Sequence, residues 1–279
     1  MKKNKIVSPF LKWAGGKRQL LGVLSELMPK GKIKSYCEPF IGGGALLFHL
    51  RPDTAYVNDI NSELINVYRA VKDSVDDLIA ELSGFENTPE MFYEVRSWDR
   101  DRIIYSTLSD TQRAARIIYL NKTCFNGLYR VNNAGEFNSP FGYYRNPNII
   151  NEPVLRAVSH YLNHADIHLS SMDYAEVLTD LKKDTFVYLD PPYDPVSDTA
   201  SFTGYSRGGF SRSEQIRLRE CCDKLSKKGI RFMLSNSATD FIREQYSEYN
   251  ITVVKARRAV NSIGYRRGDI DEVIVRNYE

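Results

Sequence analysis

A four-residue segment, Asp-Pro-Pro-Tyr at 190–193, combines a carboxylate, a rigid turn and an aromatic ring. The exocyclic amine of a nucleobase is a poor nucleophile, because its lone pair is delocalised into the ring. Asp190 and the carbonyl of Pro191 could accept both N–H groups of such an amine, draw the nitrogen toward tetrahedral geometry and free the lone pair. Pro191 and Pro192 stiffen the turn without adding main-chain donors, and Tyr193 offers a ring face on which a flipped base could stack.

The place of this segment agrees with its chemistry. It follows the apolar run 185–189, Thr-Phe-Val-Tyr-Leu, which is typical of a buried parallel strand. Open α/β sheets bind their ligands at the carboxyl ends of strands. The alternative is an aspartate that caps a strand-to-loop turn, with the prolines present only for stiffness.

A glycine turn forms the second candidate segment, Glu-Pro-Phe-Ile-Gly-Gly-Gly-Ala-Leu-Leu at 38–47. Its glycines would let a cofactor approach the main chain closely. It matches neither Gly-x-Gly-x-x-Gly nor a phosphate-binding loop, since no Lys-Ser or Lys-Thr pair follows. Asp59 ends the next apolar run about 20 residues later, where an acidic side chain can bind ribose hydroxyls. The alternatives are a tight strand–helix turn and, for Asp59, a cap on the helix that begins near Asn61.

The third segment is Phe-Leu-Lys-Trp-Ala-Gly-Gly-Lys at 10–17. Its Gly-Gly turn lies between Lys12 and Lys17 and beside Trp13, so it could hold a carboxylate or a phosphate. A solvated basic arm is the alternative.

Short apolar runs that alternate with helix-like stretches predict an α/β fold with a largely parallel sheet. The expected strands are 35–40, 55–57, 167–169, 185–189 and 230–234, and the expected helices are 62–71 and 213–225. The runs 251–254 and 272–275 suit an antiparallel hairpin at the sheet edge. The stretch from about residue 61 to 153 breaks this rhythm, with helix patterns at 73–82 and 111–120 and an Asn-, Gly-, Tyr- and Arg-rich part at 125–147, and indicates an insertion.

Composition bounds the class of protein. With 279 residues, 42% hydrophobic and 26% charged, the chain is neither disordered, collagenous nor a disulfide scaffold. Its net charge of +3 is too small to argue for nucleic-acid binding, so the distribution of charge must carry that argument. Arginines gather in the insertion (Arg96, Arg100, Arg102, Arg113, Arg116), and basic residues gather near the end of the chain (Lys255, Arg257, Arg258, Arg266, Arg267).

The remaining signals favour a cytoplasmic protein without a metal. The four cysteines form no Cys-x-x-Cys pair, no signal peptide is evident, and no apolar stretch reaches the ~18 residues of a spanning helix. His160, His164 and His168 are four residues apart, but the third lies in the expected strand 167–169 and would turn away from the others, so we expect no metal site.

Four motifs in combination resemble the Dam-type DNA N6-adenine methyltransferases, the GATC-recognising group. They are Lys-Trp-Ala-Gly-Gly-Lys, Glu-Pro-Phe-x-Gly-Gly-Gly, Asn-Asp-Ile-Asn at 58–61 and Asp-Pro-Pro-Tyr. The resemblance runs from about residue 10 to 278. It implies a Rossmann-like S-adenosyl-L-methionine-dependent methyltransferase sheet built from 1–61 and 154–279, with a mainly helical target-recognition domain, 62–153, that carries a β-hairpin. The implied reaction moves the methyl group of S-adenosyl-L-methionine to N6 of adenine in double-stranded GATC by base flipping.

The resemblance also implies the site residues. The cofactor contacts, from the methionine end to the adenine end, are Trp13, Lys17, Glu38, Phe40, Asp190, Asp59, Asp173 and Tyr174, and Asp190 would lie between the cofactor and the target adenine. The DNA contacts are Lys12, Phe125, Asn126, Leu128, Arg130, Pro140 and Arg145.

Each DNA contact carries an implied role. Arg130 would read a guanine, Lys12 the outer guanine, and Leu128 with Pro140 a thymine methyl group. Phe125 would wedge into the base stack, and Asn126 would face the base left behind by flipping. Arg145 would replace a basic residue that many relatives have where this chain has Tyr143.

Other functions remain open at this stage. The same chemistry could act on cytosine N4, on RNA adenine or on a protein glutamine, and a catalytically silent DNA-binding module would need Arg130 and Phe125 but not Asp190. The resemblance implies double-stranded DNA as partner, no membrane and no obligate protein partner. A cognate restriction endonuclease is a possible companion, and the protein would be bacterial or phage-encoded and bound to the nucleoid through DNA.

Overall fold

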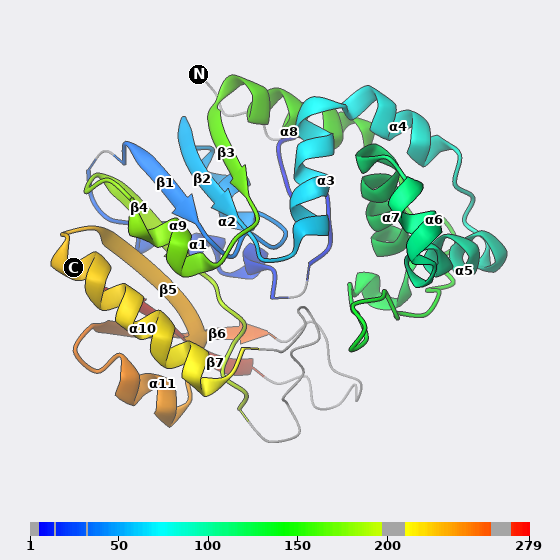
Figure 1. Cartoon of the computed structure of the whole chain (residues 1–279). Coiled ribbons are helices and arrows are strands. Elements are labelled where there is room, and N and C mark those ends of the chain that lie inside the picture. The colour runs from blue at the N-terminus through cyan, green and yellow to red at the C-terminus, as the bar shows by residue number, and fades with distance from the viewer. Residues whose placement is uncertain (1–5, 14, 32, 197–209, 258–268) are drawn as a thin grey trace.

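The computed structural model describes residues 6–13, 15–31, 33–196, 210–257 and 269–279. Within them a seven-stranded sheet has the order β3-β2-β1-β4-β5-β7-β6 (Figure 1). Its strands are β1 Ser35–Glu38, β2 Thr54–Asn58, β3 Asp166–Ser170, β4 Thr185–Leu189, β5 Arg231–Ser237, β6 Asn250–Arg257 and β7 Asp269–Arg276. Strands β1 to β5 pair in parallel, and β7 pairs antiparallel with both β5 and β6. The α/β fold, the parallel sheet and the antiparallel edge hairpin are confirmed.

Alternate residues of the strands face two separate cores. In β4, Phe186 and Tyr188 belong to one buried cluster, whereas Val187 and Leu189 belong to the other. Helices cover the second face as α9 Tyr174–Thr179, α10 Arg212–Lys227 and α11 Asp240–Gln245. The first face carries α1 Leu21–Glu26, α2 Ala45–Leu50, α3 Ser62–Asp73 and α8 Glu152–His164. A strand that is buried on both faces has no polar face, which is why these strands read as continuous apolar runs.

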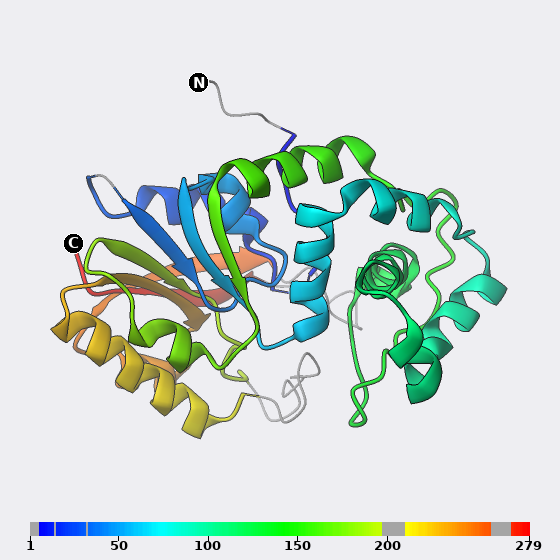
Figure 2. The ribbon, with the colours of Figure 1, turned by 45° about the horizontal axis from the view of Figure 1, so that its top comes forward.

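The remaining helices lie beyond α3, on the side away from the sheet (Figure 2). They are α4 Val75–Ser83, α5 Pro89–Ser97, α6 Arg102–Thr107 and α7 Asp110–Thr123. Helix α7 begins with a reciprocal capping box in which Ser109 and Gln112 satisfy each other's main-chain N–H groups. Helix α3 contacts both parts: its Arg69 and Lys72 donate to carbonyls of β3, while its Glu63 accepts from Tyr105 of α6. The proposed domain boundary at 61/62 therefore stays a prediction.

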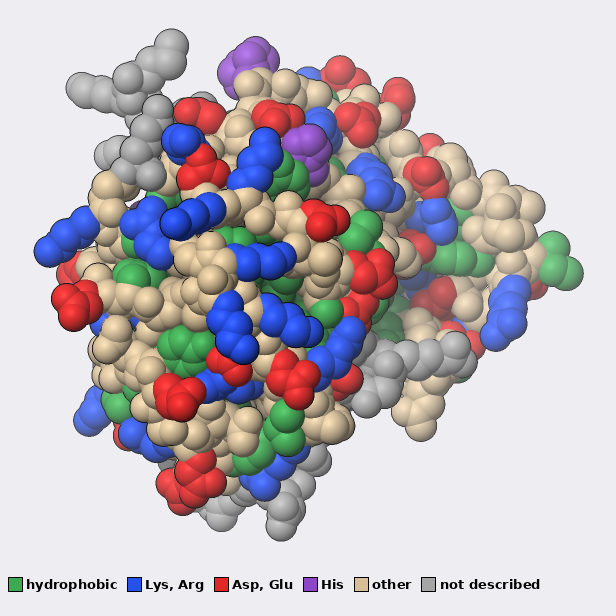
Figure 3. Space-filling view, turned by 60° about the vertical axis from the view of Figure 1, so that its left-hand side comes forward, with side chains coloured by type: hydrophobic (Ala, Val, Ile, Leu, Met, Phe, Trp, Pro, Cys, Tyr) green, Lys and Arg blue, Asp and Glu red, His purple; other side chains and the backbone are tan. Residues whose placement is uncertain are grey.

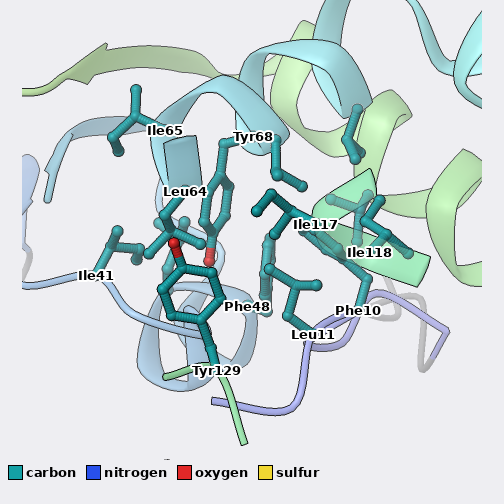
Figure 4. Close-up of a cluster of buried hydrophobic side chains, with 14 of the residues drawn as sticks. Phe10, Leu11, Ile41, Phe48, Leu64, Ile65, Tyr68, Ile117, Ile118 and Tyr129 are labelled. Carbon is teal, nitrogen blue, oxygen red and sulfur yellow. The ribbon is translucent and has the colours of Figure 1, made fainter. Parts of the chain in front are cut away.

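The N-terminal segment is held by burial. Phe10 and Leu11 are at most 5% exposed and pack with Phe48 of α2, Tyr68 of α3 and Ile117 of α7 (Figure 4). Burying a side chain of this size stabilises a fold by about 1.5–3 kcal/mol. The segment is thus anchored to helices of both parts, and the alternative of a solvated arm does not hold for Phe10 and Leu11.

The β-hairpin expected in the insertion is not a regular one. Between Cys124 and Phe141 the chain reverses with two isolated bridges, Cys124 to Phe141 and Val131 to Phe137, in place of paired strands. The turn at Asn126 and Gly127 has positive φ at both residues. This run contains four Asn, two Gly and one Pro, residue types that disfavour strand pairing, so tertiary contacts must hold it.

Three arginines of the expected basic patch, Arg96, Arg100 and Arg116, make those contacts. Arg96 and Arg100 donate to the carbonyls of Ser139 and Phe137, at 3.2 and 3.1 Å. Arg116 is buried and pairs with Asp99 at 2.7 Å, and Asp99 in turn accepts the N–H of Phe137. Part of the patch therefore serves the fold, whereas Arg102 is exposed and a phosphate-binding role stays a prediction.

The surface opposite the insertion has mixed charge. In the face shown in Figure 3, Lys and Arg side chains are interspersed with Asp and Glu. Ion pairs such as Lys34 with Asp184, at 2.8 Å, fit this mixture. Among the described helices, none has both the length and the apolar character that crossing a bilayer requires.

Candidate active site

The predicted acidic residues lie together at the carboxyl ends of the parallel strands. Glu38 ends β1, Asp59 follows β2, Asp173 follows β3 and Asp190 follows β4. These four strands are parallel neighbours, so their carboxyl ends lie side by side. The topology therefore brings together motifs that are up to 152 residues apart in the sequence, from Glu38 to Asp190.

Asp190 is paired with the lysine of the N-terminal segment. Lys17 Nζ lies 2.8 Å from Asp190 Oδ1 and also donates to the carbonyl of Gly15 at 2.7 Å. Both side chains are largely buried, at 7% and 19% exposure. Burial raises the pKa of Asp190 to about 6, and the neighbouring Lys17 opposes part of that rise.

Tyr193 is held at its hydroxyl and at one ring face. Its hydroxyl donates to Glu272 Oε2 of β7 at 2.8 Å, and Lys17 Nζ lies 4.7 Å from the ring centroid. Burial, with the nearby Asp190 and Glu272 carboxylates, raises the pKa of Tyr193 well above its usual value. Sequence reasoning missed Glu272, because its strand is far along the chain and carries no motif.

The glycine turn is fitted against an aromatic side chain. A Cβ atom on Gly42 would lie 2.9 Å from Cδ1 of Trp13, and Gly42 has a φ of +49°. Trp13 also stacks on Tyr129 of the insertion, with ring centroids 4.9 Å apart. Trp13 therefore joins the glycine turn to the chain reversal of the insertion, and no larger residue than glycine fits at position 42.

Asp59 bridges two loops. Its Oδ2 accepts the N–H of Gly42 at 3.1 Å, and its Oδ1 accepts the N–H of Asn61 at 3.0 Å. Burial raises its pKa to about 6, although both N–H donors favour the carboxylate. The helix cap itself is Asn61, whose side chain accepts from Leu64, so capping does not fully account for Asp59.

Two aromatic rings lie beside these acidic residues at the carboxyl ends of the strands. Phe40 and Tyr174 have ring centroids 5.2 Å apart. Asp173 caps α9 and forms a two-bond ion pair with Arg217 of α10, at 2.6 and 2.9 Å, which holds the pKa of Asp173 below its usual value. Sequence reasoning missed Arg217, which would read as an ordinary charged residue on an amphipathic helix.

The described residues fit a ligand that carries a positive charge, hydroxyl groups and a flat ring. Glu38 is 3% exposed, and its burial raises its pKa well above the usual value, so a cation beside Glu38 and Asp190 would relieve the cost of their ionisation. Asp59 retains acceptor capacity for hydroxyls, and Phe40 with Tyr174 offers ring faces. Side chains of this chain fill the space beside the glycine turn, with Trp13 against Gly42 and Gly43 and Tyr68 against Gly44, so close approach of a ligand to these glycines stays an expectation.

The predicted DNA contacts lie on or beside the chain reversal of the insertion. Phe125 is 56% exposed, and Asn126 and Pro140 are exposed next to it. Lys12 is exposed too, and its main chain exchanges two hydrogen bonds with the Asn121 side chain, at 2.9 and 2.7 Å. Its side chain lies against the turn, since a Cβ on Gly127 would meet Lys12 Cδ at 2.6 Å.

The other predicted DNA contacts, Arg130, Leu128 and Arg145, differ in how far they are exposed. Arg130 is half-buried, and its guanidinium donates to the side-chain and main-chain oxygens of Asn138, at 2.6 and 3.2 Å. Leu128 is half-buried and Arg145 is exposed. Of the basic residues near the end of the chain, Arg258, Arg266 and Arg267 lie outside the described residues, so that part of the expectation stays open.

The histidines form a surface pair and a separate contact. His160 and His164 stack with ring centroids 3.8 Å apart, whereas His168 stacks on Tyr56 and pairs with Asp166. In the described part of the chain, no three His, Cys, Asp or Glu side chains are grouped as a metal site requires.

Comparison with known proteins agrees with this geometry. Residues 13–260 match the model of the family described as D12 class N6 adenine-specific DNA methyltransferase. The chain is 46% identical to the type II methyltransferase M1.LlaDCHI of Lactococcus lactis subsp. cremoris, over 100% of this chain and 98% of that protein. It is 42% identical to the type II methyltransferase M.MjaIII of Methanocaldococcus jannaschii (98% and 99%) and 36% identical to the DNA adenine methylase of Escherichia coli K12 (98% and 95%).

Proposed function

The chain belongs to the D12 class N6 adenine-specific DNA methyltransferase family, and from this membership we propose that it methylates adenine within GATC after flipping the base out of the duplex. The methyl donor we propose is S-adenosyl-L-methionine. The observation that carries the proposal is Asp190, a largely buried carboxylate that ends a strand beside a rigid Pro-Pro turn and a tyrosine ring.

Asp190 and Pro191 act on the acceptor amine. Because Lys17 Nζ contacts Oδ1, we assign Asp190 Oδ2 to one N–H of adenine and the Pro191 carbonyl to the other. Adenine stacks on the face of Tyr193 opposite Lys17. When bound, the donor supplies a methyl group made electrophilic by the positive sulfur. The nitrogen that accepts it gains a positive charge and becomes acidic, and Asp190 Oδ2 can hold its proton before water removes it.

The other residues hold the donor and shield it from water. The carboxylates of Glu38 and Asp190 balance the positive charge of the donor. The charge of Lys17 lowers the pKa of both carboxyls and so favours their ionised forms. Asp59 binds the ribose hydroxyls through lone pairs that Gly42 and Asn61 do not use. Phe40, Tyr174 and Asp173 surround the adenine ring of the donor, which is distinct from the target adenine. Trp13 covers the glycine turn.

The DNA duplex meets the exposed turn of the insertion. Phe125 wedges into the stack, and Asn126 faces the base left without its partner. Arg130, Lys12, Leu128 and Pro140 read the base edges, and such contacts discriminate by about 1–3 kcal/mol each. The support for this assignment is that Phe125, Asn126, Pro140 and Lys12 are exposed together at this turn.

A two-duplex assay tests the function. We expect purified protein with labelled S-adenosyl-L-methionine to place label on adenine of a duplex that contains GATC and none on a matched duplex that contains GTTC. The product is digested to nucleosides to identify the methylated base. Label on both duplexes would overturn the base readout, and label on neither would overturn DNA adenine as the acceptor.

The pH dependence tests the role of Asp190. The carboxylate accepts an N–H more strongly than the protonated acid does, so the single-turnover rate should fall once Asp190 is protonated. Its pKa is about 6 without ligand, and the positive charge of the bound donor lowers it, so the acid limb should lie at or below pH 6. Lys17 lowers this pKa, so Lys17→Met should shift the acid limb of the profile to higher pH. Lys34→Met, which removes a lysine from the Asp184 pair at the surface, is the matched control and should leave the limb in place.

Asp59 also has a pKa of about 6, so its titration must be kept apart from that of Asp190. Lys17 is not among the groups that shift the pKa of Asp59, and saturating donor removes any effect of Asp59 on donor binding. An acid limb that is identical in Lys17→Met and in the unmodified protein would count against Asp190 as the titrating group.

We also propose a companion protein and a cellular setting. Because two similar proteins are named type II methyltransferases, we propose that a restriction endonuclease of the same specificity can accompany this chain. We expect the methyl transfer itself to need only this chain and double-stranded DNA. We place the protein in the cytoplasm of a bacterium or a phage-infected cell, on the chromosome.

A further inference from the structure

Two buried amides bracket Tyr193. Gln215 Nε2 of α10 donates to the carbonyl of Pro192 at 2.8 Å, and Asn236 Oδ1 of β5 accepts the N–H of Asp194 at 3.0 Å. The two amides also bind each other, since Asn236 Nδ2 donates to Gln215 Oε1 at 3.1 Å. Gln215 is 1% exposed and Asn236 is fully buried. The peptide groups before and after Tyr193 are thus fixed by one connected pair of side chains.

The turn needs such support from outside. Pro191 and Pro192 have no N–H, so this part of the turn cannot donate main-chain hydrogen bonds. The Pro192 carbonyl belongs to the peptide group that directly follows the 191–192 peptide, and the carbonyl of Pro191 must point at the amine. A rotation of the 192–193 peptide would move both the Pro191 acceptor and the ring of Tyr193.

The side-chain amides of Gln215 and Asn236 each use both their donor and their acceptor atoms. A neutral amide offers both a donor for a carbonyl and an acceptor for a neighbouring amide, and Gln215 uses both. Asn236 Oδ1 additionally accepts the N–H of Ser237 at 2.9 Å, so its side chain cannot rotate without breaking its hydrogen bonds with Asp194, Ser237 and Gln215. The far end of the turn has a separate anchor, because Asp194 accepts from Ser237 and Thr239.

We propose that Gln215 and Asn236 are positioning residues for methyl transfer, which set the orientation of the Pro191 carbonyl and of the Tyr193 ring for the flipped adenine. Neither side chain touches the base. The inference rests on the function proposed above and adds two residues that carry no motif. A misplacement of about 1 Å in an acceptor of this kind costs about 100-fold in rate.

The competing explanation is that the two amides only complete the core. In that case their replacement would lower stability and leave the chemistry of the folded protein unchanged. Asn66 provides a matched control, because it is a buried amide that donates to a carbonyl, that of Asp110, at 2.8 Å and away from the turn.

The first experiment measures single-turnover methyl transfer with saturating donor and GATC duplex. We expect Gln215→Met to lower the rate by about 10–100-fold, with donor and DNA affinity within threefold. Asn66→Met should lose stability in thermal unfolding but keep its rate within twofold. An active unmodified protein and a Gln215→Met rate within threefold of it would overturn the positioning role alone, whereas an inert unmodified protein would overturn the proposed function as well.

A base analogue reports the placement of the acceptor without any reaction. With 2-aminopurine in place of the target adenine, the fluorescence of the flipped base is quenched where it stacks on Tyr193. We expect the lifetime distribution in Gln215→Met to shift toward the long, unstacked component, and Asn66→Met to match the unmodified protein. An unchanged distribution in Gln215→Met would argue that Tyr193 does not depend on the amide pair.

A second variant guards against a Gln215→Met chain that does not fold. Gln215→Glu keeps the shape but places a carboxylate oxygen opposite the Pro192 carbonyl, and burial raises the pKa of such a carboxyl. When protonated, it donates an O–H to that carbonyl. We therefore expect its rate to rise as pH falls from about 8.5 to 7, where the unmodified rate is flat. Parallel profiles for the two proteins would overturn the proposal.

Discussion

Asp190→Ala should lower the single-turnover rate of methyl transfer by about 10³-fold, the largest effect expected of any single substitution in this chain. The substitution removes the acceptor for one N–H of adenine, and the loss of one preorganised polar group at a reacting centre costs about 10²–10³-fold in rate. The Pro191 carbonyl and the Tyr193 ring stay in place, since Gln215, Asn236 and Glu272 hold the turn. Affinity for donor and for DNA should change by less than tenfold.

The measurement must separate this loss from the effect on Lys17. Removing Asp190 leaves a buried lysine without its 2.8 Å partner, and an uncompensated buried charge can disturb the site by itself. The double variant Lys17→Met with Asp190→Ala removes both charges and should remain as inactive as Asp190→Ala. Recovery of the rate to within tenfold in the double variant would show that the lysine, and not the missing acceptor, causes the loss.

Asp190→Asn completes the series. The asparagine keeps one oxygen in a similar place but loses the charge, and its amide can turn an N–H toward the adenine amine. We expect a rate between those of the unmodified protein and of Asp190→Ala. Asp180→Ala, on the loop after α9, removes an exposed carboxylate and should leave the rate unchanged.

The sheet was predictable because of how it is buried. Strand β4 is buried at every residue from Thr185 to Leu189, so its sequence is an uninterrupted apolar run. The position of Asp190 at its carboxyl end then followed from general features of parallel sheets. Glu38 and Asp59 could be placed in the same way, because each ends an apolar run of its own.

The supporting residues could not be found from the sequence. Gln215 and Asn236 are common polar residues in a helix and a strand, and only the fold brings their amides within 3.1 Å. Glu272 lies 79 positions from Tyr193, and no local pattern links the two. Local spacing reports which face of an element a residue occupies, but it does not report which distant element packs there.

The internal contacts of Arg96, Arg100 and Arg116 could not be predicted for a related reason. A cluster of arginines in the sequence is compatible with a phosphate-binding surface and equally with side chains that donate hydrogen bonds to carbonyls of the same chain. Arg116 is 1% exposed and pairs with Asp99, a partner 17 residues away on a different helix. Because the chain reversal at 124–141 lacks paired strands, its carbonyls require donors, and the arginines supply them.

The chain reversal itself yields the second large effect. Arg130→Ala should lower kcat/KM on GATC by about 100-fold and reduce the preference over a duplex with one G·C pair replaced by A·T to less than tenfold. A bidentate contact to guanine discriminates by about 1–3 kcal/mol, and Asn138 holds the guanidinium ready for it. The experiment compares kcat/KM across GATC and duplexes altered at either guanine.

Arg145→Ala distinguishes base reading from phosphate binding. Arg145 is exposed, and as a phosphate contact it should weaken all duplexes equally and reduce the salt dependence of binding by about one unit of slope. Arg130→Ala should instead spare the duplex altered at the guanine that Arg130 reads, because that duplex already lacks the contact, and should still weaken the duplex altered at the other guanine. If Arg130→Ala weakened every duplex to the same extent, Arg130 would be a backbone contact, and the specificity for GATC would have to arise from Lys12, Leu128 and Pro140.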